Sequence, residues 1–138
     1  MEKLKLKYES ACKAIESLSK AVNKFEKFGA DDPGDEFETA RDSMIKRFEY
    51  SIDTTWKYLK EYLKEKKGID RRSPKDVFKE VLSVGLSSEK ETVEALKMVD
   101  ARNLTSHTYN EELAGDICEK IPAFFKLMKN FLEKIKPE

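Results

Sequence analysis

The sequence lacks any long apolar segment. A helix that spans a membrane needs about 20 consecutive apolar residues, and no part of the 138-residue chain approaches that pattern. The N-terminal residues from Met1 to Lys7 have no apolar run after their charges, so they do not have the pattern of a signal peptide. We therefore expect a cytoplasmic protein that does not contact a membrane.

An excess of charge of either sign is also missing. Lys and Arg together number 27, Asp and Glu together number 27, and charged residues make up 39% of the chain. A protein that holds nucleic acid by bulk charge alone needs a clear positive excess. Any nucleic-acid binding by this chain must therefore be local.

Cysteine is scarce. Cys12 and Cys118 are the two cysteines, they form no Cys-x-x-Cys pair, and no nearby histidine completes a metal site with either of them. Both lie among the apolar positions of expected helices, where a free thiol behaves as a small hydrophobic group. We predict two packing residues, no metal site and no cofactor.

No segment alternates between apolar and polar residues over a useful length, so no sheet is expected. Apolar residues recur instead at spacings of three and four, which is typical of amphipathic helices. A chain of 138 residues forms one domain. We therefore predict one all-helical domain over residues 1–138, an up-and-down bundle of about five helices.

Capping residues, glycines and prolines set the expected boundaries of these helices. The first helix is expected over about 3–28, and a hairpin linker over 29–35 leads to a second helix over about 35–67, with Gly68 as its stop. A third helix is expected over 73–85, and a fourth from Ser87 or Ser88 to Asn103 or Leu104. The fifth is expected over 111–134. In the fourth helix, we expect the inward-facing residues to be Val93, Leu96 and Val99. In the second, we expect them to be Phe37, Met44, Ile45, Phe48, Ile52, Trp56, Leu59 and Leu63.

One stretch of nine residues, 101–109, concentrates the reactive side chains. It holds the single histidine, His107, with Arg102 five residues before it and Tyr109 two residues after it. Histidine changes charge near neutral pH, arginine is a permanent fork of donors for phosphate oxygens, and tyrosine can donate, accept or be modified. We interpret the other helices as a scaffold that presents this stretch.

The geometry of a helix restricts how the stretch can work. Five residues of unbroken helix would place Arg102 and His107 about 140° apart around the axis, on different faces. The segment 104–108 is poor in strong helix formers, and Asn110 resembles the N-cap of a new helix. We therefore expect a bend after the fourth helix that lets Arg102 and His107 meet in one groove.

A basic cluster spans the end of the second helix and the loop after it. Its members are Lys64, Lys66, Lys67, Arg71, Arg72 and Lys75. A solvated surface is the simpler interpretation, and a contact for RNA or for an acidic partner is the other, with Lys64, Lys67, Arg71 and Arg72 as its candidates.

The spacing Arg102-Asn103-x-x-x-His107-x-Tyr109 resembles the R-[N/D]-x-x-x-H-x-Y motif of the HEPN superfamily. Other segments follow the order found in the nucleotidyltransferase substrate-binding protein family, over roughly residues 4 to 135. These segments are Arg41-Asp42, Arg47-Phe48-Glu49, Trp56 to Lys60, Ser73-Pro74, Val77-Phe78 and Gly85-Leu86. The resemblance implies a helical bundle, a homodimer and a cognate minimal nucleotidyltransferase as partner. It also implies that related pairs act as HEPN toxin and nucleotidyltransferase antitoxin.

Metal-independent RNA cleavage needs a base for the 2′-hydroxyl proton, a cation for the charge that grows on the phosphorane, and an acid for the leaving oxygen. His107 fits the first role and Arg102 the second, while the third requires another residue or a second copy of the site across a two-fold axis. Asn103 would orient His107 or a phosphate oxygen. Tyr109 would line the groove or, as the resemblance implies, accept AMP from the partner.

Plainer interpretations of the same residues stay open. Asn103 could cap the end of the fourth helix, and Tyr109 could be a buried ring with its hydroxyl on a backbone carbonyl. Two functions follow from the whole sequence: a ribonuclease toxin, or a non-catalytic subunit that binds a nucleotide or other substrate for a separate nucleotidyltransferase.

Overall fold

The computed structural model describes residues 2–28 and 34–138, and all of its regular elements in those ranges are helices. The elements are α1 (Glu2–Glu26), α2 (Asp35–Lys67), α3 (Pro74–Ser83), α4 (Glu89–Leu104), the short 3-10 turn η1 (Thr105–His107) and α5 (Glu111–Lys134). The prediction of an all-helical protein with five helices is confirmed.

The helix ends follow the capping residues of the sequence. Gly68 ends α2 in the left-handed conformation with φ 68°, which glycine adopts without a steric penalty. The Ser73 side chain accepts from the backbone N–H of Asp76 at the start of α3, and Asn110 does the same for Leu113 at the start of α5. These local signals explain why the predicted ranges of α2 and α5 match the observed ones.

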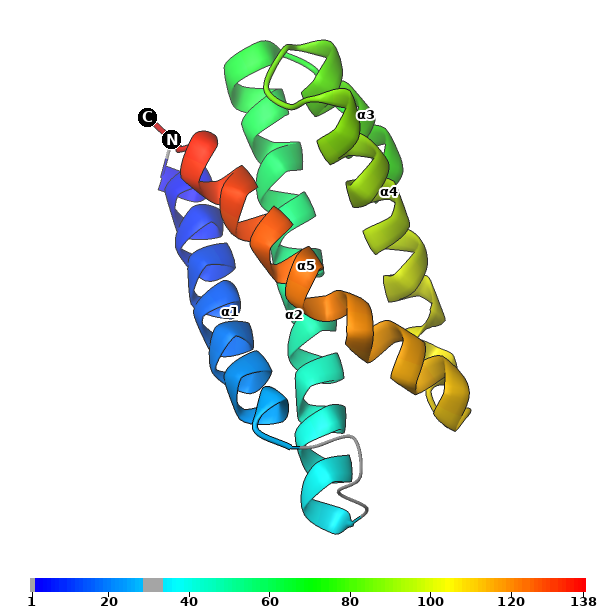
Figure 1. Ribbon diagram of the computed structural model, residues 1–138. Helices are drawn as coiled ribbons and strands as arrows, with labels where there is room; N and C mark the ends of the chain where they lie inside the picture. The colour runs from blue at the N-terminus through cyan, green and yellow to red at the C-terminus, as the bar shows by residue number, and fades with distance from the viewer. Residues whose placement is uncertain (1, 29–33) are drawn as a thin grey trace.

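The first helix is slightly shorter than expected. It ends at Glu26, and the residues Lys27 and Phe28 form a turn through backbone hydrogen bonds to the carbonyls of Lys24 and Phe25. Residues 29–33 of the expected hairpin linker lie outside the described residues. The expected antiparallel pairing of the two long helices is seen directly, since α1 and α2 lie side by side along most of their length (Figure 1).

α5 crosses in front of α2, while α3 and α4 cover another side of the same long helix (Figure 1). Phe48 of α2 is fully buried and stacks on Phe124 of α5, with ring centroids 5.8 Å apart. The hydroxyls of Tyr8 and Tyr58 donate to the carbonyls of Leu132 and Ile135, which fixes the end of α5 against α1 and α2. α2 is therefore the central element of the core.

The inner face of α4 differs from the prediction. Val93 was expected to face inward, but its exposed fraction is 51%, and that part of the prediction is wrong. The buried positions of the helix are Thr92, Ala95, Met98, Val99 and Ala101. A threonine can join this face because its hydroxyl bonds to the Ser88 carbonyl at 2.9 Å, so no polar group is left unsatisfied there.

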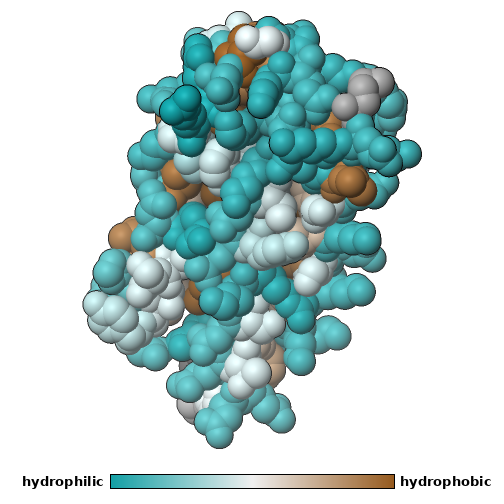
Figure 2. Space-filling view, turned by 180° about the vertical axis from the view of Figure 1, so that it is seen from behind, coloured by the Kyte–Doolittle hydropathy of each residue, from teal (hydrophilic) through white to brown (hydrophobic). Residues whose placement is uncertain are grey.

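The surface is mainly hydrophilic. Seen from behind, apolar residues appear as small separate patches among polar side chains (Figure 2). Over the described ranges, none of the helices combines the length and the apolar character that crossing a bilayer requires.

Cys118 is buried in α5, as expected of a packing residue, and burial raises the pKa of its thiol from 9.0 to about 11. Cys12 is partly buried on α1, and burial raises the pKa of that thiol as well. Raised pKa values keep both thiols protonated near neutral pH, and a protonated thiol is a poor nucleophile.

The buried thiol of Cys118 predicts a loss of stability at alkaline pH. Because its pKa is higher in the folded than in the unfolded state, its contribution is complete below about pH 9 and is lost as the pH rises towards 11. Urea denaturation at about pH 8 and about pH 10.5 measures this, with Cys118→Val as the matched control. We expect a smaller fall in the free energy of unfolding for the variant, and an equal fall in both proteins would contradict the assignment.

Candidate functional site

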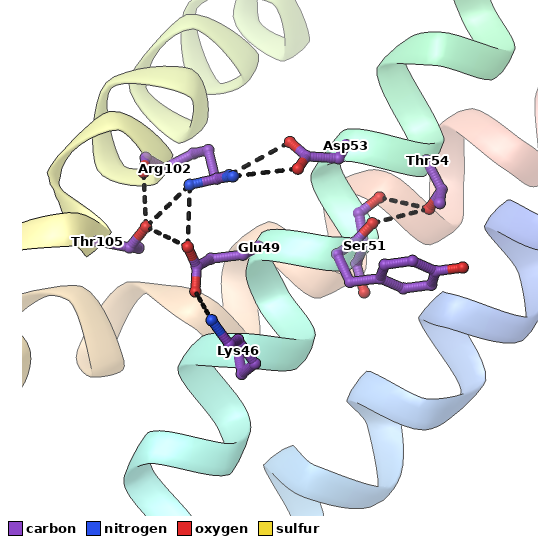
Figure 3. Close-up of polar contacts among 8 residues, drawn as sticks. Lys46, Glu49, Ser51, Asp53, Thr54, Arg102 and Thr105 are labelled. Atoms are coloured by element: carbon purple, nitrogen blue, oxygen red, sulfur yellow. Dashed lines mark hydrogen bonds and ion pairs between the residues drawn. The ribbon is translucent and has the colours of Figure 1, made fainter.

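Arg102 lies in the last turn of α4 and points towards α2. Its Nε and Nη2 donate to the two carboxylate oxygens of Asp53 at 3.2 and 3.1 Å, and its Nη1 donates to Glu49 Oε2 at 3.0 Å. Glu49 and Asp53 are four residues apart on α2, so both carboxylates face the guanidinium from one side (Figure 3). The Arg102 side chain keeps 31% of its surface exposed.

Thr105 completes this arrangement at the first residue of η1. Its buried hydroxyl accepts from Arg102 Nη1 at 3.2 Å, and it lies 3.0 Å from Glu49 Oε2 and 2.7 Å from the Arg102 carbonyl (Figure 3). A hydroxyl that bonds to the carbonyl three residues back competes with the helical hydrogen-bond pattern. α4 accordingly ends at Leu104, one of the two predicted ends, and gives way to a 3-10 turn.

The charges of this cluster alternate in sign. The hydrogen bond to Asp53 raises the pKa of Arg102, although burial acts in the opposite direction. Lys46 Nζ lies 3.8 Å from Glu49 Oε1, so the order along the cluster is Lys46, Glu49, Arg102, Asp53 (Figure 3). Four hydrogen bonds occupy most of the five N–H donors of the guanidinium. The arginine is therefore held in one orientation, with little donor capacity to spare.

His107 is exposed at the end of η1. Its backbone carbonyl accepts from the N–H of Asn110 at 3.1 Å, and its ring meets that of Tyr109 edge to face, with centroids 6.0 Å apart. Tyr109 has an exposed fraction of 82%, so the interpretation as a buried ring is wrong. Both rings are accessible to a partner or a substrate.

The predicted bend is present between α4 and α5, but the expected meeting of Arg102 and His107 in one groove stays a prediction. Among the described residues, Arg102 bonds to Asp53, Glu49 and Thr105 but not to His107. Asn103 is exposed in the last turn of α4, and the residue that caps this helix is Thr105, so the structure does not support Asn103 as the cap. A role for Asn103 beside His107 stays a prediction.

Arg41 holds the start of α5, the helix that follows the site, against α2. It is buried on α2 and donates to Asp42 Oδ1 at 3.2 Å and to the carboxylate of Glu111 in the first turn of α5. The hydrogen bond to Glu111 raises the pKa of Arg41. This link joins the start of α5, two residues after Tyr109, to α2.

The basic cluster runs from the end of α2 to the start of α3. At a rise of about 1.5 Å per residue, Lys67 lies about 20 Å along α2 from Asp53. Arg71 Nη2 pairs with Glu80 at 3.1 Å. Arg71 is exposed, as are Lys64, Lys67 and Arg72. Lys75, the last member of the cluster, pairs with Asp100 at 2.6 Å, two residues before Arg102 on α4, so the Lys67 end of the cluster is far from Arg102 but the whole cluster is not. Contact of the cluster with RNA or a partner stays a prediction.

The sequence interpretation missed Asp53 and Thr105 altogether and assigned no role to Glu49. The available signal was the spacing of Glu49 and Asp53, which places two carboxylates on one helix face. Within the described ranges, no group of three or more His, Cys, Asp and Glu side chains is arranged to hold a metal ion.

A helical bundle with this connectivity has been seen before. A structure from Thermus thermophilus is similar with a TM-score of 0.80 and 39% identity, covering 91% of this chain and 98% of that one. The tri-AMPylated HEPN toxin of Shewanella oneidensis, in complex with the MNT antitoxin, has a TM-score of 0.69 at 18% identity, covering 93% and 97%. A structure of the toxin–antitoxin MntA-HpeT is similar with a TM-score of 0.70 and 18% identity, covering 94% of this chain and 99% of that one. The chain therefore shares its fold with these toxins.

The family follows from the sequence match. The family model described as nucleotidyltransferase substrate binding protein like matches residues 6–137. The chain belongs to this family, as its motifs indicated. A comparison with curated proteins finds no match.

Proposed function

We propose that this protein is the HEPN toxin of a toxin–antitoxin pair and that it cleaves RNA without a metal ion. The observation that carries the proposal is the exposed imidazole of His107 at the break between α4 and α5, five residues after an arginine that α2 holds in place. The fold shared with toxins found in complexes with an antitoxin supports the same function.

In this reaction His107 accepts the proton of a ribose 2′-hydroxyl. The 2′-oxygen then attacks the adjacent phosphorus, the bond from phosphorus to the 5′-oxygen breaks, and the products are a 2′,3′-cyclic phosphate and a 5′-hydroxyl. Arg102 offsets the negative charge that grows on the phosphorane, with Asp53 and Glu49 fixing its guanidinium in one orientation.

The proton for the leaving oxygen has to come from a second acid. The chain has one histidine, so we propose a homodimer in which the His107 of the second copy supplies it. We also propose control by a cognate minimal nucleotidyltransferase that attaches AMP to the hydroxyl of Tyr109. The 82% exposure of this residue and its edge-to-face contact with His107 support that role, because a modified tyrosine would cover the imidazole.

A second candidate is the non-catalytic subunit that binds a nucleotide or another substrate for the nucleotidyltransferase. The observation that supports this candidate is that most N–H donors of Arg102 already bond to Asp53, Glu49 and Thr105. An arginine neutralised in this way has less charge to offer to a phosphorane than a free one.

Incubation of the purified protein with single-stranded RNA and an excess of EDTA tests the proposal. We expect cleavage that EDTA does not inhibit and products that end in a 2′,3′-cyclic phosphate, because no step requires a metal ion. Light scattering on the same sample measures whether the protein is a dimer. Intact RNA after incubation with a folded dimer would contradict the ribonuclease and favour the binding subunit.

A further inference from the structure

A groove of about 440 Å³ lies between α1, α2 and the end of α4, with Arg102 as part of its lining. Its walls include Ser17, Lys46, Arg47, Tyr50, Asp53 and Arg102. Its volume falls within the range of roughly 300–1,000 Å³ that small-ligand sites occupy. Because Arg102 is one of its walls, whatever fills the groove lies next to the proposed reaction site.

Tyr50 supplies an unused aromatic face at this groove. Its exposed fraction is 60%, and among the described residues neither its hydroxyl nor its ring has a hydrogen-bond or ring partner. A single exposed tyrosine needs no special explanation by itself. Tyr50, however, lines a groove together with Lys46, which lies one turn earlier on the same helix. The ring can stack on a base while the lysine binds the phosphate of the same nucleotide.

The positive charges of the groove come from three side chains. The Lys46 side chain is 85% exposed, and within the described part of the chain its ammonium has one ion-pair contact, at 3.8 Å with Glu49. Arg47 Nη1 donates to the Ser17 carbonyl at 3.1 Å, which holds its guanidinium against the wall formed by α1. Lys46 is therefore better placed than Arg102 to meet a phosphate.

Lys46 and Glu49 also line a second groove, of about 400 Å³, together with Thr105, Ser106 and Thr108. The two grooves thus share Lys46 and Glu49 in their walls, and one includes Arg102 while the other includes the turn that carries His107. An RNA strand that passes over these shared residues would place one nucleotide in each groove and the intervening phosphate near Lys46.

We propose that the groove beside Arg102 binds one nucleotide of a single-stranded RNA, with the base stacked on Tyr50 and a phosphate on Lys46. The proposal rests on the function proposed above and names its substrate contacts. A single exposed ring requires an unstacked base, which a single strand offers and an A-form duplex withholds. Single-stranded RNA is therefore the substrate class.

The test uses a short single-stranded oligoribonucleotide with a 2′-O-methyl group on every sugar. The nucleophile of the cleavage reaction is blocked in this probe, so binding is measured apart from catalysis. Tyr50→Ala is expected to weaken binding about fivefold or more at every salt concentration, because base stacking is not ionic, whereas Tyr50→Phe retains wild-type affinity.

Lys46→Gln is expected to reduce the slope of log Kd against log salt by about 0.7, the value for one phosphate contact in a single strand. Lys57→Gln is the matched control, since Lys57 is exposed on the same helix about 16 Å further along. We expect no change of slope for this variant.

Several results would overturn the subsite. The first is that the wild-type protein does not bind the probe, and the second is that wild type and Tyr50→Ala bind it equally well. The third is a changed mass of the assembly in Tyr50→Ala, which would show that the ring contacts a second copy of the chain. If EDTA-treated protein cleaves no RNA but binding still depends on Tyr50, the ribonuclease proposal fails and the subsite stands. If cleavage occurs and neither variant changes binding, only the subsite fails.

Discussion

His107→Ala is expected to lower the rate of RNA cleavage by roughly 10²- to 10⁴-fold, the contribution usual for a positioned acid or base. The effect belongs at the upper end if the His107 of each copy serves one of the two proton transfers, because one substitution then removes both the base and the acid. Single-turnover cleavage of a labelled RNA in EDTA measures the rate.

The fold should not change in this variant. The His107 ring is exposed, and its contact among the described residues is the edge-to-face packing on Tyr109, so its loss creates no cavity. The melting temperature and the mass of the assembly are therefore expected to match those of the wild type. Ser106→Ala is the matched control: Ser106 is exposed on the same turn and lines the second groove, but it takes no part in either proton transfer, so a much smaller loss is expected.

Two results would count against His107. Undiminished cleavage by His107→Ala would assign the activity to another group or to a contaminating nuclease. Equal losses in His107→Ala and Ser106→Ala would indicate that the turn, and not the imidazole, determines the rate.

The parts of the fold that could be predicted are those with local causes. α2 and α5 have the predicted bounds because Gly68 and Asn110 act within one turn of the chain. The inner face of α4 was predicted wrongly at Val93, because the residues that face the core include Thr92 and Ala95, which apolar periodicity underrates. A threonine that satisfies its own hydroxyl does not stand out in a count of apolar residues.

The site could be predicted only in part, for a similar reason. Arg102, His107 and Tyr109 were identifiable because they lie within eight residues and include the single histidine of the chain. The partners Glu49 and Asp53 lie 53 and 49 residues away from Arg102 in the sequence. Their spacing of four places both carboxylates on one face of α2, but it does not single them out among 27 acidic residues. Only the packing of α4 on α2 selects these two carboxylates, so the constraint on Arg102 became visible in three dimensions.

The largest expected loss of stability follows from Phe48→Ala. Phe48 is fully buried, and its ring stacks on Phe124 at 5.8 Å where α5 crosses α2. Replacing a buried phenylalanine with alanine removes its apolar contacts and leaves a cavity, at a typical cost of about 3–5 kcal/mol. A domain of this size is usually stable by about 5–15 kcal/mol, so the variant would approach the limit of folding.

Urea denaturation measures this loss, and Tyr50→Ala is its matched control. Tyr50 lies two residues further along α2 on the exposed side, so its replacement is expected to change the free energy of unfolding by about 0.5 kcal/mol or less. Because Glu49 lies between these two residues and holds Arg102, Phe48→Ala should also loosen the guanidinium, and cleavage should fall before global unfolding is reached. A loss below about 1 kcal/mol for Phe48→Ala would show that α5 does not depend on this contact to stay on α2.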